Sequence, residues 1–414
     1  MQDEQIERES MDFDVVIVGG GPSGLSAAIR LRQLALQAGL DEFMVCVVEK
    51  GSEFGAHTLS GAVIEPRALD ELIPDWKEKG APLNVPVTED RVFYLNSATR
   101  SIRTPDSIIP APMHNQGNYI VSLGNVVRWL AEQAEELEVM MFPGFPASEV
   151  LYNDDGSVRG VLTGDMGVAA DGSQKPSYEP GYELNAKYTI FAEGCRGHLG
   201  KRLISRFALD KDSDPQHYGI GIKELWEIDS SKHEPGVVMH GLGWPLTETG
   251  SSGGWWLYHD ENNQVSFGLV VDLSYHNPYM SPFDEMQRLK THPVIKEVLE
   301  GGKRLSYGAR ALTKGGLNSL PKLTFPGGVL VGDDAGFLNP AKIKGTHTSM
   351  KSGMLAAEAI FAALQSGRQH DEVETYSQMF KDSWLYEDNY SARNFAPAMH
   401  RMGLFMGGAF TFIE

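Results

Sequence analysis

The sequence predicts an α/β protein with a parallel sheet in one domain and a mostly antiparallel sheet in a second. Residues 13–18 and 43–49 are short apolar runs, and residues 23–38 between them carry apolar side chains at helical spacing. This strand–helix–strand order is typical of a parallel sheet. Apolar residues alternate with other residues over 265–271, inside an aromatic region from 216 to 275. Such alternation indicates antiparallel strands with one covered face.

The composition limits the classes of function that this chain can have. The chain has 414 residues, of which 42% are hydrophobic, and that is enough for two or three domains and a large core. It carries 36 Lys and Arg against 55 Asp and Glu, a formal net charge of −19. So acidic a chain repels phosphate backbones, and we find no local basic patch, so no nucleic-acid partner is expected.

The two cysteines, Cys46 and Cys195, are too few for a disulfide scaffold or for a four-cysteine cluster, and we predict no metal site. Cys46 lies in an apolar run and is expected to be inert. A redox role for Cys195 is the less favoured alternative. No apolar stretch approaches the roughly 20 residues of a spanning helix. The acidic amino terminus has neither signal-peptide nor transit-peptide features. A bacterial cytoplasmic protein or a processed organellar chain fits these features.

A glycine-rich turn follows the first predicted strand. Residues 19–24 read GGGPSG, which matches G-x-G-x-x-G at Gly19, Gly21 and Gly24. The first glycine allows the tight turn, the second lets a pyrophosphate approach, and the third lets the helix pack on the strand. Glu49 ends the second strand, where a carboxylate accepts hydrogen bonds from an adenosine ribose and disfavours a 2′-phosphate. The motif predicts a Rossmann-like dinucleotide site; the alternative is an ordinary glycine-rich turn.

A second motif, near the carboxyl end, indicates which dinucleotide is bound. Residues 329–336 read VLVGDDAG, a strand that ends in Gly-Asp, and a helix is expected from about 346 to 364. A carboxylate at Asp333 can hold the ribityl hydroxyls that FAD has and NAD lacks. The positive end of the following helix would face the flavin ring and stabilise its reduced, anionic form. FAD is therefore the expected cofactor; the alternative for Asp333, taken alone, is a turn or helix-cap aspartate.

Five longer strings resemble the electron transfer flavoprotein–ubiquinone oxidoreductase family, and the similarity runs from about residue 12 to the end. They are GAHTLSG at 55–61, DWKEKGAPLN at 75–84, FAEGCRGHL at 191–199, GGKR at 301–304 and KIKGTHT at 342–348. The resemblance implies a glutathione-reductase-type FAD-binding domain with an inserted, mostly antiparallel α+β quinone-binding domain. It also implies an electron-transferring-flavoprotein dehydrogenase, which takes electrons from reduced electron transfer flavoprotein and passes them to membrane ubiquinone.

The resemblance also implies domain boundaries. We expect a discontinuous FAD-binding domain at 12–90, 116–205 and 305–395, and a ubiquinone- and membrane-contacting domain at 91–115 and 206–304. Residues 396–414 are expected to begin a further membrane-contacting segment. The family's 4Fe-4S cluster finds no ligands in this sequence, which suggests a fragment or a short natural form. The latter alternative is a Fix-type flavoprotein, whose cluster lies on a separate ferredoxin subunit.

The candidate site residues combine both lines of reasoning. For the cofactor they are Gly19, Gly21, Gly24, Glu49, Lys50, His57, Ser60, Asp333, Gly345 and Thr346. Hydrogen bonds from Asn339, Thr346 and Thr348 are expected to tune the flavin, as the resemblance implies. Gly253 and Gly254 are expected to contact the quinone, because adjacent glycines can expose backbone to a flat ring and because the resemblance implies this role for the pair. The alternative for this pair is a β-bulge beside core aromatics.

Three apolar segments are candidates for membrane contact: residues 93–95 with 108–113, and residues 402–413. None is long enough to span a bilayer, so monotopic insertion is the physical option, and burial against a partner domain is the alternative. We expect a peripheral protein on the cytoplasmic face of a bacterial inner membrane, or on the matrix side of the mitochondrial inner membrane in a eukaryote.

Two rival functions share the same framework. An FAD-dependent aromatic monooxygenase would need access for NAD(P)H and would use oxygen. A non-catalytic binding protein on this fold would not retain both Glu49 and Asp333 for a cofactor. Rapid reduction by NADPH would favour the first rival, and a colourless purified protein would favour the second.

Overall fold

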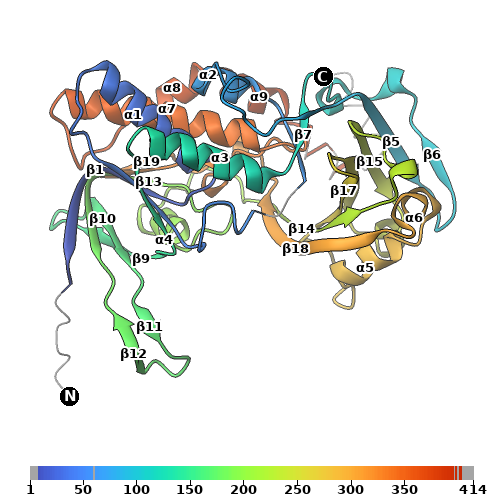
Figure 1. Ribbon diagram of the computed structural model, residues 1–414, viewed down its shortest axis with the longest axis horizontal. Helices are drawn as coiled ribbons and strands as arrows, with labels where there is room; N and C mark the ends of the chain where they lie inside the picture. Colours follow the sequence, from blue (N-terminus) through green and yellow to red (C-terminus); the bar gives the residue numbers. More distant parts are fainter. Residues whose placement is uncertain (1–7, 59–60, 396, 399–400, 403–414) are drawn as a thin grey trace.

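The computed structural model describes residues 8–58, 61–395, 397–398 and 401–402. Two sheets lie side by side in Figure 1, with most helices packed over the first and the second at the right of the view. The apolar segment predicted at 402–413 falls almost entirely outside the described residues, and so does Ser60.

The first sheet is the predicted parallel one. Within the described residues its main path runs β19-β20-β13-β1-β2-β8, and β10 pairs with β13 and with β9. β1 is parallel to both β2 and β13, and residues Val15 to Val18 are buried because both faces of the sheet are covered. The strands are β1 (Ser10–Val18), β2 (Val45–Glu49), β8 (Met140–Pro143), β9 (Ala147–Tyr152), β10 (Val158–Thr163), β13 (Glu183–Phe191), β19 (Thr324–Phe325) and β20 (Gly328–Leu330).

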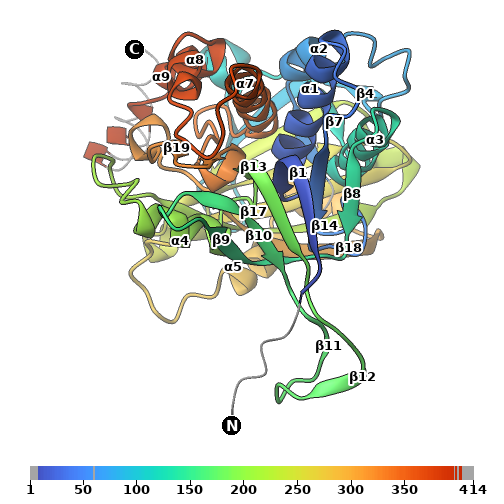
Figure 2. The ribbon, with the colours of Figure 1, turned by 90° about the vertical axis from the view of Figure 1, so that its left-hand side faces the viewer.

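Helices cover this sheet. Figure 1 shows α1, α3 and α7 along its upper face, whereas α4 and the β9–β10 ribbon lie below it. α1 and α7 are close neighbours in the two views of Figures 1 and 2. The helices are α1 (Pro22–Gln37), α2 (Arg67–Leu72), α3 (Leu123–Glu136), α4 (His198–Arg206), α7 (Thr346–Gln365), α8 (Thr375–Lys381) and α9 (Trp384–Ser391).

The second sheet has the order β18-β14-β17-β16-β15-β5-β6 in the described part of the chain, and every pairing except that of β15 with β5 is antiparallel. The alternating residues of β17 are buried in one core with α5 (Pro282–Leu289) and α6 (Pro293–Leu299), as their pattern predicted. The strands are β5 (Glu89–Leu95), β6 (Ser101–Arg103), β14 (Tyr218–Glu227), β15 (Val237–Gly243), β16 (Gly253–His259), β17 (Gln264–Asp272) and β18 (Lys303–Thr313).

The chain enters the second sheet twice, first through β5–β6 and then through β14–β18. β18 pairs with β14 along its whole length, up to Thr313 opposite Tyr218. The chain therefore stays in the second sheet as far as Thr313, and the domain boundary expected at residue 305 stays a prediction.

Smaller elements complete the fold. β3 (Ala62–Ile64), β7 (Tyr119–Val121) and β4 (Val85–Pro86) form a short sheet, and β11 (Met166–Val168) with β12 (Gln174–Glu179) forms the hairpin that projects downward in Figure 2. The 3-10 turns are η1 (Asp106–Ile108), η2 (Ala111–Met113), η3 (Ser230–Lys232), η4 (Leu246–Thr249), η5 (Leu317–Ser319) and η6 (Gly332–Asp334). Among the described residues, none of the helices has the length and apolar character needed to cross a bilayer.

Candidate flavin and quinone site

The three motif glycines between β1 and α1 have different surroundings. Gly19 has a φ of +108°, and a side chain there would overlap the Ala192 carbonyl of the neighbouring strand. A methyl group on Gly24 would overlap the Gly19 carbonyl, so this glycine lets α1 pack against the turn. A methyl group on Gly21 would meet no atom within 4 Å. The space beside Gly21, at the N-terminus of α1, is therefore open enough to receive a ligand's phosphates, and that Gly21 contacts them stays a prediction.

Glu49 is held at the end of β2 by two backbone donors. Its Oε2 accepts a hydrogen bond from the Gly20 N–H at 2.9 Å, and its Oε1 accepts one from the Gly51 N–H at 2.7 Å. These bonds fix the direction of the Glu49 carboxylate. His57 Nδ1 lies 3.9 Å from Oε1, and Lys50 is exposed in the same turn. The remaining lone pairs of Glu49 suit the hydroxyls of an adenosine ribose.

Asp333 lies in η6 directly after β20. Its Oδ1 is buried and has no hydrogen-bond partner among the described residues. Burial raises the pKa of this carboxyl to about 6, although the charge of Arg310 acts in the opposite direction. A buried carboxylate oxygen without a donor is costly unless a ligand supplies one. The orphaned oxygen fits a ribityl hydroxyl, and together with the open space beside Gly21 it shows that the residues present suit FAD.

The residues expected to tune the flavin lie around the start of α7, but their side chains differ in hydrogen-bond partners and in exposure. Both hydrogens of the Asn339 amide go to Asp388, to its main-chain oxygen and to Oδ2, and Asn339 Oδ1 accepts from the Ala341 and Lys342 N–H groups. Asn339 therefore shapes the loop before α7. Thr348 donates to the Gly345 carbonyl at 2.8 Å, while Thr346 is partly exposed at the first position of the helix. Direct contacts of these residues with a flavin stay a prediction.

Neither cysteine is a reactive thiolate. Burial raises the pKa of Cys46 far above its usual range. Burial, with a smaller contribution from Asp333, raises the pKa of Cys195 to about 11. A thiol that stays protonated at neutral pH is a poor nucleophile. Redox chemistry at this site therefore depends on the flavin.

The two glycines proposed for the quinone start β16. Gly253 has a φ of +157°, and a side chain there would overlap the Val270 carbonyl. A methyl group on Gly254 would lie 3.0 Å from both the Gly241 carbonyl oxygen and Leu242 Cδ2. Packing within the sheet thus accounts for Gly253. Position 254 is tight but not closed, and whether it contacts a quinone stays a prediction.

Alternation along the strands places Gly254 on the inner face, the sheet face opposite α5 and α6. This inner face lies against the first domain. Gly61 packs so closely on Ser266 of β17 that a side chain at 61 would overlap it, and Arg310 of β18 donates to the His57 carbonyl at 3.2 Å. A ligand above Gly254 would therefore lie between the second sheet and the FAD motifs.

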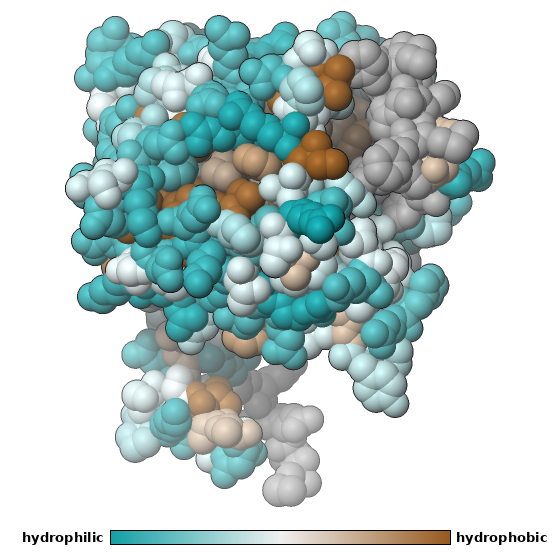
Figure 3. All heavy atoms as spheres, turned by 90° about the vertical axis from the view of Figure 1, so that its right-hand side faces the viewer, coloured by the Kyte–Doolittle hydropathy of each residue, from teal (hydrophilic) through white to brown (hydrophobic). Residues whose placement is uncertain are grey.

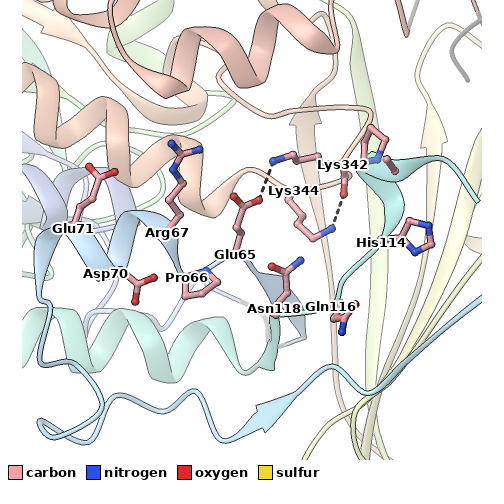
Figure 4. A pocket seen from close by; sticks show the side chains of 13 residues that line it. Glu65, Pro66, Arg67, Asp70, Glu71, His114, Gln116, Asn118, Lys342 and Lys344 are labelled. Atoms are coloured by element: carbon pink, nitrogen blue, oxygen red, sulfur yellow. Dashed lines mark hydrogen bonds and ion pairs between the residues drawn. The ribbon is translucent and has the colours of Figure 1, made fainter. Parts of the chain in front are cut away.

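A polar pocket of about 560 Å³ opens where the loop before α7 meets α2 and η2. Figure 4 shows Lys342 pointing to Glu65, with Lys344 beside it. Lys342 also pairs with Asp388 at 2.5 Å, and Lys344 Nζ donates to the Lys342 carbonyl. Burial lowers the pKa of Lys344 to about 8. These charges compensate one another and brace the loop that leads into α7.

Sequence reasoning missed three side chains on the inner face: Lys223, Trp256 and Arg310. Arg310 lies close enough to act on the charge of Asp333 and bonds the segment that follows Glu49. No local motif marks any of the three. Their positions follow from strand register, which the sequence alone does not show.

A dinucleotide site at the N-terminus of α1, an orphaned carboxylate placed for a ribityl chain, and a second sheet covering them define a flavin-dependent oxidoreductase. A family model described as ETF-QO, ubiquinone-binding, matches residues 218–312, and one described as NAD(P)-binding Rossmann-like domain matches residues 17–73. Both matches agree with the α/β architecture predicted from the sequence.

Curated relatives extend the match over nearly the whole chain. A probable electron transfer flavoprotein-ubiquinone oxidoreductase of Acinetobacter baylyi is 65% identical, covering 99% of this chain and 75% of that protein. The electron transfer flavoprotein-ubiquinone oxidoreductase of Pseudomonas aeruginosa is 62% identical over 99% of this chain and 74% of its own length. This chain belongs to the electron transfer flavoprotein–ubiquinone oxidoreductase family, as its motif strings indicated.

Solved structures support the fold. A geranylgeranyl bacteriochlorophyll reductase-like protein of Thermoplasma acidophilum aligns with a TM-score of 0.72 at 19% identity, covering 97% of this chain and 90% of that one. At this identity the likeness concerns the fold alone. It shows that the arrangement of the two domains is shared with that protein.

Proposed function

We propose that this chain accepts electrons from reduced electron transfer flavoprotein on a bound FAD and passes them to ubiquinone. One observation carries the proposal: the sheet that matches a ubiquinone-binding family model turns its inner face toward the FAD motifs of the first domain. A quinone on that face would lie within reach of the flavin. The names of the relatives agree with this reaction.

Bound FAD supplies the ability to take up and release electrons singly or in pairs. The chain's own residues bind and orient it. The turn at 19–24 receives the pyrophosphate, Glu49 the adenosine ribose and Asp333 the ribityl chain. The N-terminus of α7, which begins at Thr346, directs its partial positive charge toward the same region and favours added negative charge there.

We further propose that the chain lies on a membrane surface without crossing it. Ile102 on β6 is 59% exposed and Ile108 in η1 is 57% exposed, and both lie in or near the predicted segments. Figure 3 shows apolar atoms gathered in and around a hollow on the face that carries the second sheet, among polar neighbours. A ubiquinone tail is insoluble in water, so the quinone has to enter from such a surface.

The experiment compares electron donors. The FAD-loaded chain is mixed anaerobically with reduced electron transfer flavoprotein or with NADPH, and the flavin absorbance near 450 nm is followed. Loss of absorbance with the flavoprotein and none with NADPH is the expected result. Rapid bleaching by NADPH with no response to the flavoprotein would contradict the proposal and favour a monooxygenase.

A further inference from the structure

Lys223 occupies a central place on the inner face. It lies on β14, directly opposite Gly268 of β17 on one side and Gly308 of β18 on the other. Residues directly opposite each other across a sheet share a face, and Phe267 and Leu269, which flank Gly268, point into the core with α5 and α6. Lys223 therefore points toward the first domain, with no side chain beside it on either neighbouring strand.

The ammonium group of Lys223 has no hydrogen-bond or ion-pair partner among the described residues. Burial, and then the charge of Arg310, lowers its pKa to about 8. Arg310 is two residue pairs further along the sheet, opposite Gly221, and it too points to the inner face. No carboxylate contributes to the pKa of Lys223. A partly buried cation next to a second cation calls for a ligand that accepts hydrogen bonds.

Trp256 provides a second donor beside it. Trp256 is directly opposite Gly268, and a methyl group on Gly268 would overlap its ring atoms Cζ2 and Cη2. The indole thus lies across Gly268 toward Lys223, and its Nε1 is buried without a partner among the described residues. His240, opposite Trp256 on the far side, bonds Tyr258 at 2.8 Å, and burial lowers its pKa to about 3, so it adds no charge.

We propose that Lys223 and the Trp256 N–H bind one carbonyl oxygen of the quinone ring, and that Lys223 protonates that oxygen as the quinone is reduced. This inference rests on the proposed function and names the residues that recognise the substrate. Gly254, two residue pairs along from Trp256, presents backbone without a side chain on the same face. Every member of a quinone series shares this carbonyl. The contact therefore orients the ring and does not discriminate between quinones with tails of different length.

The reaction balances with groups already named. A quinone that becomes a quinol gains two electrons, which the reduced flavin supplies, and two protons. One proton moves from Lys223 Nζ to the bound oxygen, the N–H bond breaking as the O–H bond forms, and the second comes from water. The neutral amine then regains a proton from solvent, which a group of pKa about 8 does readily at neutral pH.

The test compares Lys223→Met and Lys223→Arg with Lys296→Met as a matched control, because Lys296 lies on α6, on the covered side of the sheet, and is 57% exposed. Calorimetric titration with a short-chain ubiquinone measures binding, and stopped-flow mixing measures reoxidation of the prereduced flavin. FAD content and the rate of flavin reduction by the donor are recorded for each variant.

Lys223→Met is expected to weaken quinone binding and to slow reoxidation by about tenfold or more, with FAD content and flavin reduction unchanged. The wild-type reoxidation rate should fall as pH rises through about 8, because the amine loses its proton there. Lys223→Arg stays charged and should lose this pH dependence. Trp256→Phe, which keeps the ring but not the N–H, should weaken binding, and Lys296→Met should change nothing.

Unchanged binding and an unchanged pH profile in Lys223→Met would overturn the inference. So would normal quinone binding with slowed flavin reduction, because Lys223 would then act on the flavin. A wild-type chain whose reduced flavin does not respond to quinone would instead overturn the proposed function, so the two failures are distinguishable.

Discussion

Gly353 of α7 lies directly against the main-chain carbonyl of Ser23 in α1, so close that a methyl group at 353 would overlap it. The contact locks together two helices that are far apart in the sequence. Gly24, one residue after Ser23, meets the glycine turn in the same way. The N-terminus of α1, which faces the proposed pyrophosphate, and that of α7, which faces the proposed flavin ring, are therefore set by backbone contacts.

Gly353→Ala is expected to destabilise the protein by about 1–3 kcal/mol, the usual cost of overpacking a close contact. It should also weaken FAD retention, because both helix N-termini move relative to each other. Thermal unfolding of the apoprotein and the flavin content after purification measure the two effects. A variant with wild-type stability and a full complement of flavin would show that the contact is not restrictive.

Gly21 borders open space that a ligand could occupy, whereas Gly24 makes a close contact within the protein. Gly21→Leu is expected to abolish FAD binding while leaving the apoprotein as stable as the wild type, because its side chain enters open space. Gly24→Ala should lower the stability of the apoprotein as well, since its methyl group overlaps the Gly19 carbonyl. A bright yellow Gly21→Leu protein with normal stoichiometry would sink the assignment of the pyrophosphate site.

Asp333→Asn is expected to weaken FAD binding by about tenfold or more, as expected for losing hydrogen bonds to a charged group, roughly 1.5–3 kcal/mol. The same change should stabilise the apoprotein at pH 7. The folded pKa of Asp333 is raised from its ordinary value of about 4 to about 6, so this group favours folding below about pH 4, and that contribution is lost as pH rises through 6. Chemical unfolding at pH 5 and pH 7 checks the sign. A variant less stable than wild type at pH 7 would refute it.

Gly254→Ala is expected to slow quinone reduction by about tenfold, which corresponds to roughly 1.4 kcal/mol of transition-state stabilisation. Its methyl group would also press on Leu242, so the double variant with Leu242→Ala is the control. If the quinone contacts Gly254, making room at 242 should not restore the rate. Recovery in the double variant would mean that the single change acted only through packing.

Local sequence patterns were sufficient to predict the elements of the first domain that carry the FAD motifs. The strand, the glycine turn and α1 follow one another within 28 residues of chain, from Ser10 to Gln37, and Glu49 ends the next strand as expected. The start of α7 at Thr346 was also predicted, because a glycine precedes a long apolar helix. In each case the signal and the structure it specifies lie in the same short segment.

Relationships across strands were not predictable in this way. Lys223 faces Trp256 across Gly268 only because β14, β17 and β16 pair in one particular register. A shift by one residue would turn Lys223 into the core. Likewise, the Asn339 amide bonds Asp388 on α9, a partner that no local pattern reveals, and the expected hydrogen bond from Asn339 to the flavin stays a prediction.

The central claim is that electrons on the flavin of this chain pass to a quinone held on the second sheet. Anaerobic mixing of the photoreduced, FAD-loaded protein with a short-chain ubiquinone tests it most directly. The account predicts that the flavin absorbance returns with one quinol formed per flavin, and that the return is slower in Gly254→Ala. A flavin that stays reduced in the presence of quinone and is reoxidised only when oxygen is admitted would contradict it.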